Sequence, residues 1–277
     1  MKSILLVCLA ACLFTTSFAQ TDTTAKKETN DTIRIGGMII VKKPGSNQRE
    51  IIRNDKTVKI PGRKQKPENV TTNWSILDLG FSGFNDKSIY TSAAAQAFAP
   101  GSTEDWFDLR GGRSRNVNYW FFMQRLNMIE HVLNFKYGLG LELNNYFFDD
   151  ERIRFQKNPT LITMDPNLKD AKKNKLAVDY LTLPLMLNVN LTPNKKNGFG
   201  FSGGVSAGYM YSARQKTKTG KVEKVKNDFD LQRWKLAYVG ELNLGPIKLY
   251  GSYAFKSMWE KGLDQTPYNV GFRLSNW

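Results

Sequence analysis

The feature that most constrains the fold of this chain is a regular alternation of bulky apolar residues with small or polar ones. From Leu133 to Asn144 every second residue is Leu, Phe or Tyr, and the residues between them are Asn, Lys, Gly and Glu. Similar alternation runs from Leu181 to Leu191, from Phe199 to Ser212 and from Tyr268 to Ser275. Because successive side chains of a strand point to opposite faces, this period of two predicts long β-strands with chemically different faces.

Eight candidate strands of this kind follow one another from Trp74 onward. Their expected bounds are 74–85, 114–128, 132–148, 175–191, 198–212, 230–243, 247–258 and 266–277. The connections after the first, third, fifth and seventh strands are long and polar, whereas those after the second, fourth and sixth are short. An even strand number with long loops on one rim and short turns on the other is typical of bacterial outer-membrane barrels, whose long loops face outward.

The two faces distinguish a membrane barrel from a soluble one. An eight-stranded closure has room only for side chains inside it, and eight strands of inward Leu and Phe would overfill that space. We therefore expect the bulky face to contact lipid and the small and polar face to fill a plugged lumen. The polar residues expected there, some of them able to form ion pairs, are Lys136, Glu142, Glu241, Lys248 and Arg273. The predicted fold is an all-β, eight-stranded antiparallel up-and-down transmembrane β-barrel with a disordered N-terminal arm, located in the cell outer membrane.

Aromatic residues gather at the predicted strand ends, as expected for the girdles of a membrane barrel. At the outer ends these are Tyr146, Phe147, Tyr180, Tyr209, Tyr211, Trp234, Tyr253, Phe255, Trp259 and Tyr268, and at the inner ends Trp74, Phe135, Phe199 and Trp277.

Two places depart from the regular strand alternation. The segment 116–124 does not alternate cleanly, so its faces cannot be assigned, and Pro184 lacks a ladder donor, which predicts a local bulge.

The first 19 residues are expected to be a secretory signal peptide. Lys2 precedes an apolar run from Ile4 to Phe14, and a small-x-small site ends at Ala19. An alternative is a lipoprotein processing site that would make Cys12 the first mature residue. Both cysteines of the chain, Cys8 and Cys12, lie in this segment, so disulfides, thiolate metal sites and cysteine nucleophiles are excluded for the rest.

Residues 20–73 are polar and contain no aromatic residue, so they are expected to form a disordered or extended periplasmic arm before the barrel at 74–277. One stretch, from Thr32 to Val41, has strand composition. We interpret it as an edge strand or as a strand that forms against a partner.

Three stretches resemble the PorT-like outer-membrane β-barrel family of Bacteroidetes: Leu77–Phe84, Gly138–Tyr146 and Tyr180–Leu187. The resemblance covers about 74–277 and implies a Gram-negative outer-membrane barrel. Some members of that family assist a protein secretion system. The terminal Trp277 is similar to the aromatic residue read by the barrel assembly machinery during biogenesis, although it falls out of step with Phe272 and Leu274.

The chain carries a formal charge of +15, or +14 once Lys2 is removed with the signal peptide. Because the signal peptide would export the protein from the cytoplasm, we do not expect it to bind nucleic acid. Basic residues concentrate in two outward loops: Lys169, Lys172, Lys173 and Lys175 in one, and Arg214, Lys216, Lys218, Lys221, Lys224 and Lys226 in the other. They suit contact with anionic groups, either the phosphates of outer-membrane lipid and lipopolysaccharide or an acidic envelope protein partner. The alternative is a solvated charged loop that resists aggregation.

The sequence predicts no catalytic, cofactor-binding or metal-binding residue. The single histidine, His131, lies in an expected periplasmic turn, at the wrong rim for a Ser and His pair acting on outer-leaflet lipid. Asp149, Asp150 and Glu151 could bind a divalent cation or form a solvated acidic loop. We expect a non-enzymatic structural or interaction component of the cell envelope, in a secretion assembly or elsewhere. The alternatives are an enzyme that modifies outer-leaflet lipid and a small-molecule or ion channel.

Overall fold

The computed structural model describes two units of the chain, 1–66 and 67–277. In the first it describes four strands, β1 (Asp31–Ile35), β2 (Met38–Lys42), β3 (Arg49–Arg53) and β4 (Lys56–Ile60). In the second it describes residues 68–193, 198–245 and 247–275. The expected signal peptide and Trp277 lie outside the described residues.

The four N-terminal strands form one antiparallel sheet in the order β1-β2-β3-β4. They lie within the range expected to be a disordered or extended arm, where each strand contains at least two Ile or Val residues although aromatic residues are absent. The stretch 32–41, interpreted as one strand, is divided into β1 and β2, with Ile35 paired to Met38. The structure therefore adds a small sheet to the arm.

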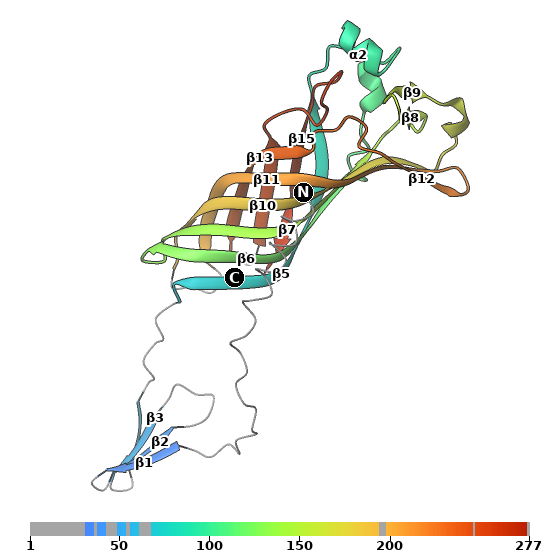
Figure 1. Cartoon of the computed structure of the whole chain (residues 1–277). Coiled ribbons are helices and arrows are strands. Elements are labelled where there is room, and N and C mark those ends of the chain that lie inside the picture. Colours follow the sequence, from blue (N-terminus) through green and yellow to red (C-terminus); the bar gives the residue numbers. More distant parts are fainter. Residues whose placement is uncertain are drawn as a thin grey trace, which may run out of the picture. The chain divides into compact units, whose positions relative to one another are not determined.

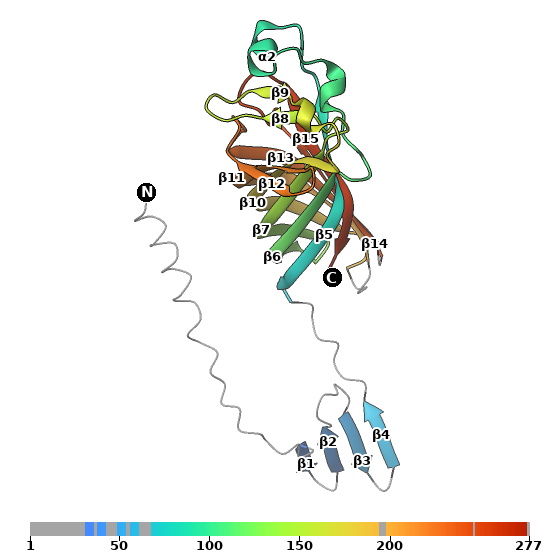
Figure 2. The ribbon, with the colours of Figure 1, turned by 90° about the vertical axis from the view of Figure 1, so that its right-hand side faces the viewer.

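The second unit is a closed ring of antiparallel strands. Its members are β5 (Val70–Asp86), β6 (Arg115–Ile129), β7 (Leu133–Phe147), β10 (Lys173–Asn190), β11 (Phe199–Lys218), β13 (Trp234–Leu244), β14 (Ile247–Ala254) and β15 (Gln265–Leu274). Each of these eight strands pairs with the next along the chain, and β15 pairs with β5 to close the ring. Figures 1 and 2 show the resulting barrel, with the long connections gathered at one end. We call that end the long-loop rim and the other the short-turn rim.

The bulky apolar face of the strands points out of the ring. On β10, Leu181, Leu183, Leu185 and Leu187 are 40 to 51 % exposed, whereas Thr182, Met186 and Asn188 are at most 3 % exposed. Water would be a poor solvent for such a band of exposed leucine, phenylalanine and tyrosine, but hydrocarbon accepts it. The orientation expected from the alternation is the one that the structure has.

An irregularity in β6 explains why its faces could not be assigned from the sequence. The pairing with β7 shifts by one residue between Trp120 and Phe122, so Phe121 is an extra residue in this strand. Asn118 and Trp120 point into the ring on one side of the shift, and Met123 does so on the other. The bulge changes the phase of the alternation within the strand.

The bulge expected at Pro184 is absent. The pairing of β10 with β7 lacks Leu183 and Pro184 but keeps the same register on both sides of them, and Pro184 pairs with Ser206 of β11. The register shift of β10 lies instead between Asp179 and Tyr180. Pro184 removes a donor from one ladder without requiring an inserted residue.

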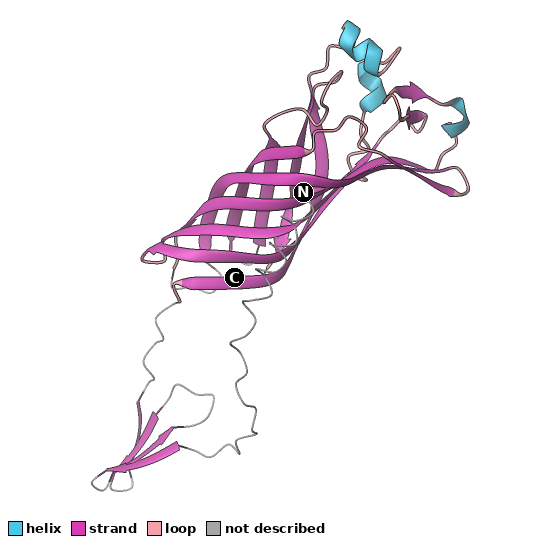
Figure 3. Ribbon diagram, viewed as in Figure 1, coloured by secondary structure: helices cyan, strands magenta, loops and turns pink. Residues whose placement is uncertain are grey.

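The long connections contain their own short elements. These are α2 (Ala93–Phe98), the 3-10 helices η2 (Glu104–Phe107) and η3 (Pro166–Leu168), the hairpin of β8 (Ile153–Phe155) with β9 (Ile162–Met164), and β12 (Val222–Lys226), which pairs with an extension of β11. In Figure 3 the helices lie at the long-loop rim. Among the described residues, no helix is long and apolar enough to cross a membrane.

These connections pack into an apolar cap over the long-loop rim. Trp259 stacks on Phe155 of β8 at 6.0 Å between ring centroids and meets Phe98 of α2 edge-on at 5.4 Å. Tyr146 and Tyr180, expected in the outer girdle together with Trp259, are buried in this cluster. Those three expectations were wrong: Tyr146 and Tyr180 have the same strand phase as the inward-facing Asn144 and Thr182, and Trp259 belongs to a connection that packs into the cap. Tyr209, Tyr211, Trp234, Tyr253, Phe255 and Tyr268 remain exposed on the outer face.

Candidate functional site: a charged lumen and a cationic ribbon

An ion-pair network crosses the lumen near Arg273 of β15. The Arg273 guanidinium donates to both carboxylate oxygens of Asp78 on β5, at 2.7 Å each, and also pairs with Glu241 on β13. Glu241 in turn pairs with Lys136 on β7. All four side chains are at most 5 % exposed. The network therefore ties together strands on different sides of the ring.

A second pair lies closer to the long-loop rim. Glu142 of β7 pairs with Lys235 of β13, and it accepts hydrogen bonds from Asn144 and Asn269, both at 3.0 Å. Thr182 of β10 donates to its second oxygen at 3.3 Å. Such saturation with donors is what a buried carboxylate requires to remain charged.

All five residues expected in the lumen are buried there, but they do not form one cluster. Lys136, Glu142, Glu241 and Arg273 take part in the two networks, whereas Lys248 donates to the backbone oxygen of Ser275 at 3.0 Å. Two further ion-pair partners, Asp78 and Lys235, were not predicted. Each stands between two apolar residues, in Leu77-Asp78-Leu79 and in Trp234-Lys235-Leu236, so the alternation could have assigned both to the lumen.

The lumen has little free space. The cavity lined by Trp120, Glu142, Tyr250 and Arg273 has a volume of about 30 Å³, which is room for about one water molecule. Glycine permits this filling: a Cβ atom on Gly140 would lie 2.7 Å from the indole of Trp120.

The cationic residues of β10, β11 and β12 align in rows across the sheet. Lys175 of β10, Lys216 of β11 and Lys224 of β12 face one another directly. Lys173 faces Lys218 in the next row, and Arg214 faces Lys226 in the row on the other side. The residues between them, Asn174, Gln215 and Thr217, are buried, so the cations occupy the outer face. We call Lys173, Lys175, Arg214, Lys216, Lys218, Lys224 and Lys226 the cationic ribbon.

The ribbon lies beyond the lipid-facing band, past Tyr211, which is 50 % exposed on β11. Partial burial and the neighbouring Lys173, Lys216 and Arg214 lower the pKa of Lys175 to about 8. Burial, Arg214 and Lys224 also lower the pKa of Lys216. Like charges directly opposite each other in a sheet are destabilising. Within this array only Arg214 has an acidic partner among the described residues, Asp179.

The remaining cations expected to contact an anionic partner lie near the ribbon. Lys169 and Lys172 are exposed in the loop before β10, and Lys221 is exposed between β11 and β12. The two basic loops recognised in the sequence are thus brought to neighbouring positions by the pairing of β10 with β11.

The other candidate residues take structural positions. His131 lies in the turn between β6 and β7 with a positive φ of 60°, and its backbone N–H donates to Asn127 Oδ1 at 2.7 Å. In the acidic triplet, Arg110 pairs with Asp149 and Glu151, and Arg152 pairs with Asp150. Hydrogen bonding to Arg152 lowers the pKa of Asp150. Among the described residues no group of acidic, histidine or cysteine side chains is arranged to hold a metal ion.

Comparison with known proteins agrees with this architecture. Residues 111–256, more than half of the chain, match the family described as outer membrane protein beta-barrel domain. The crystal structure of Ail, the attachment invasion locus protein of Yersinia pestis, is similar over 75 % of this chain and 100 % of that one, with 11 % identity and a TM-score of 0.31. The comparison with curated proteins found no match. The chain thus belongs to the outer membrane protein beta-barrel domain family, and its ring of strands is a barrel of the outer membrane.

Proposed function

We propose that this protein is a non-enzymatic interaction component of the outer membrane, whose cationic ribbon binds the phosphate groups of outer-leaflet glycolipid. The observation that carries the proposal is the row formed by Lys175, Lys216 and Lys224 on three adjacent strands. A fold that places like charges opposite one another loses free energy in isolation. Anions bound between the lysines would offset that loss.

The position of the ribbon fits the headgroup region of a membrane. The exposed aromatic rings of Tyr209 and Tyr211 mark the end of the lipid-facing band on β11, and the ribbon begins at Arg214, three residues further along the strand. Aromatic girdles lie at the membrane interface. Cations directly beyond a girdle meet the phosphates of anionic lipids, and each is worth about 1 kcal/mol of binding at the membrane surface.

A plugged lumen is part of the proposal, and it argues against a channel. It is supported by the ion pairs of Arg273 and Glu142, the small volume left around Trp120 and the apolar cap. A non-enzymatic role is supported by the position of His131 at the short-turn rim, opposite to the ribbon. The narrower resemblance to PorT-like barrels would add a role in a secretion assembly to this proposal.

The test measures binding of lipid A to the full-length mature protein in detergent micelles. We expect lipid A with both phosphates to bind more tightly than dephosphorylated lipid A, because the acyl chains are the same and only the anionic groups differ. The double variant Lys175→Gln and Lys216→Gln should lose about 2 kcal/mol, or roughly 30-fold in affinity. The matched control is Lys87→Gln with Lys157→Gln, two lysines of the long connections that lie outside the cationic ribbon.

Equal affinity for the two forms of lipid A would contradict the proposal. So would equal losses in the ribbon variant and in the control variant. If the ribbon variant keeps its affinity for lipid A but no longer binds an acidic protein, then the ligand of the ribbon is that protein and not the glycolipid.

A further inference from the structure

The wall of the barrel is open between β13 and β14 near the long-loop rim. The register of these two strands begins at Ala237 opposite Ala254, and the last hydrogen bond beyond it runs from Phe255 N to Leu236 O at 2.8 Å. The next backbone contact, from Gln232 N to Met258 O at 2.8 Å, joins the connecting segments. Between these two bonds, residues 233–235 and 256–257, all of them described, have no ladder hydrogen bond to each other.

Pro267 gives a reason for the early end of β14. It stands on β15, just beyond the last pair of β14 with β15, Tyr253 with Tyr268. Proline has no N–H to donate, so it cannot extend a ladder. Ala254, at the level of Pro267, still pairs with Ala237 of β13, and regular pairing with both neighbours ends beyond it.

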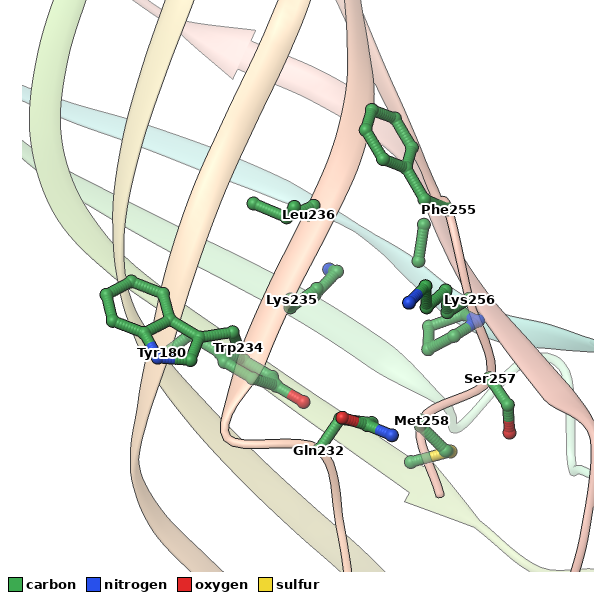
Figure 4. A pocket seen from close by; sticks show the side chains of 11 residues that line it. Tyr180, Gln232, Trp234, Lys235, Leu236, Phe255, Lys256, Ser257 and Met258 are labelled. Atoms are coloured by element: carbon green, nitrogen blue, oxygen red, sulfur yellow. The ribbon is translucent and has the colours of Figure 1, made fainter. Parts of the chain in front are cut away.

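The opening contains a pocket of about 190 Å³ that reaches both faces of the wall. Trp234, Leu236 and Phe255 border it and are 44 to 63 % exposed on the lipid-facing side. Tyr180, Lys235, Ala254 and Met258 also border it, are buried, and belong to the lumen and the cap. Figure 4 shows side chains from both groups surrounding the opening.

Tyr180 offers an unused hydrogen bond to this pocket. Its side chain is 2 % exposed, and its hydroxyl has no hydrogen-bond partner among the described residues. Gly208, on the strand between β10 and β13, leaves the space through which the ring reaches Lys235, whose Nζ lies 5.6 Å from the centroid of that ring. The hydroxyl oxygen itself is not fully enclosed, so it opens onto the pocket, where a ligand group can accept a hydrogen bond from it.

The pocket also has a cation at its edge. Lys256 is exposed and makes no ion pair within the described part of the chain, whereas Lys235 is already paired with Glu142. The Gln232 amide already donates to the backbone oxygen of Trp259 at 3.3 Å, so the polar groups that remain are the Tyr180 hydroxyl and the Lys256 ammonium. They suit an oxyanion, and the bordering Trp234 and Phe255 suit an alkyl chain.

We propose that this opening binds a single-chain anionic amphiphile, with its carboxylate or phosphate head against Tyr180 and Lys256 and its alkyl chain leaving past Trp234 and Phe255 into the membrane. The volume of about 190 Å³ is smaller than that of a complete ligand pocket, roughly 300 to 1,000 Å³. The pocket therefore holds the head and the start of the chain, and the rest lies in lipid. The site is separate from the cationic ribbon, so either proposal can fail without the other.

The test titrates palmitate, labelled with ¹³C at its carboxyl carbon, into the full-length mature protein in nonionic detergent micelles. The ¹³C shift of the carboxylate reports its surroundings and gives a dissociation constant. We expect Tyr180→Phe and Lys256→Gln each to weaken binding about 10-fold, because each removes one hydrogen bond to a charged group. Tyr146→Phe is the matched control: Tyr146 is also a buried tyrosine of the cap, but it does not line the pocket. This control should bind palmitate as the unchanged protein does.

Two competitors identify the head group. Lysophosphatidic acid and palmityl alcohol are added to the labelled complex; the anionic lipid should displace palmitate and the alcohol should not. Displacement by lysophosphatidic acid at lower concentration than by unlabelled palmitate assigns the site to phosphates, and the reverse order assigns it to carboxylates. Palmitate that does not bind, or that binds Tyr180→Phe and Lys256→Gln as tightly as the control, overturns the proposal.

Discussion

Removal of Arg273 tests whether the lumen network holds the barrel together. In Arg273→Met, Asp78 keeps two neutral donors, the indole N–H of Trp120 at 2.7 Å and the amide of Asn118 at 3.3 Å, but loses the guanidinium with which it forms a two-oxygen ion pair. Glu241 keeps Lys136. Leaving a buried charge without its partner typically costs 3–5 kcal/mol. Because Asp78 retains two hydrogen bonds and Glu241 retains an ion pair, we expect the lower end, about 3 kcal/mol.

The assay is reversible urea unfolding of the protein in lipid vesicles, followed by tryptophan fluorescence. The control is Lys248→Met, which removes a lumen cation that donates to Ser275 and should cost only about 1 kcal/mol. In the double variant Asp78→Asn and Arg273→Met, both charges of the pair are gone, so its loss should be well below the sum of the two single losses. Additive losses in this cycle, or equal costs for Arg273→Met and Lys248→Met, would refute the role assigned to the network.

Three further perturbations follow from the packing and the charges. Gly140→Val should prevent the barrel from folding, because its Cβ would meet Trp120 at 2.7 Å, whereas Gly203→Ala, with open space around it, should fold normally; the heat-dependent gel shift of the barrel distinguishes them. Binding of lipid A should weaken as the pH rises through about 8, where Lys175 loses its proton, and not only near the usual lysine value of about 10.4; affinity measured from pH 6 to 10 checks this. Trp259→Ala should leave the strands intact but loosen the cap by roughly 3–5 kcal/mol, so limited proteolysis should cut the long connections faster and spare the ring.

The strands and their faces could be predicted because both follow from the period of two. The predicted start of β7 at 132 lies one residue from the observed Leu133, and the Leu181–Leu187 face points outward as expected. The bulge at Phe121 could not be identified from the sequence, because an extra residue in one strand appears there only as a loss of alternation.

The cap could not be predicted because its contacts have no local signature. Phe98, Phe155 and Trp259 come from three different connections, each of which is mainly polar in sequence. An isolated aromatic residue in a polar loop does not indicate its partner. Only the closure of the ring, which gathers the connections at one rim, brings the rings of Phe98 and Phe155 to 5.4 and 6.0 Å from that of Trp259.

The residues of the cationic ribbon were predicted from the sequence, but their alignment into one surface was not. The two basic loops were recognised from composition, yet the second of them is mostly β-structure, because β11 continues to Lys218 and pairs with both β10 and β12. Pairing converts a run of lysines at every second position into rows of lysines across strands. A solvated loop could separate these charges, whereas the sheet fixes them, which is why the ribbon and not the loop composition supports anion binding.

Two of the errors in the predicted strand bounds coincide with the proposed amphiphile site. The sequence places a strand at 230–243 and another at 247–258, but β13 starts at Trp234 and β14 ends at Ala254. Leu231 and Met258, both within the predicted strands, are buried in the cap instead. Apolar residues that satisfy a strand pattern can equally join a cap, and the segments between the cap and the ladder are then left without strand partners. An opening in the wall arises where these two kinds of packing meet, which is where Tyr180 has its unpaired hydroxyl.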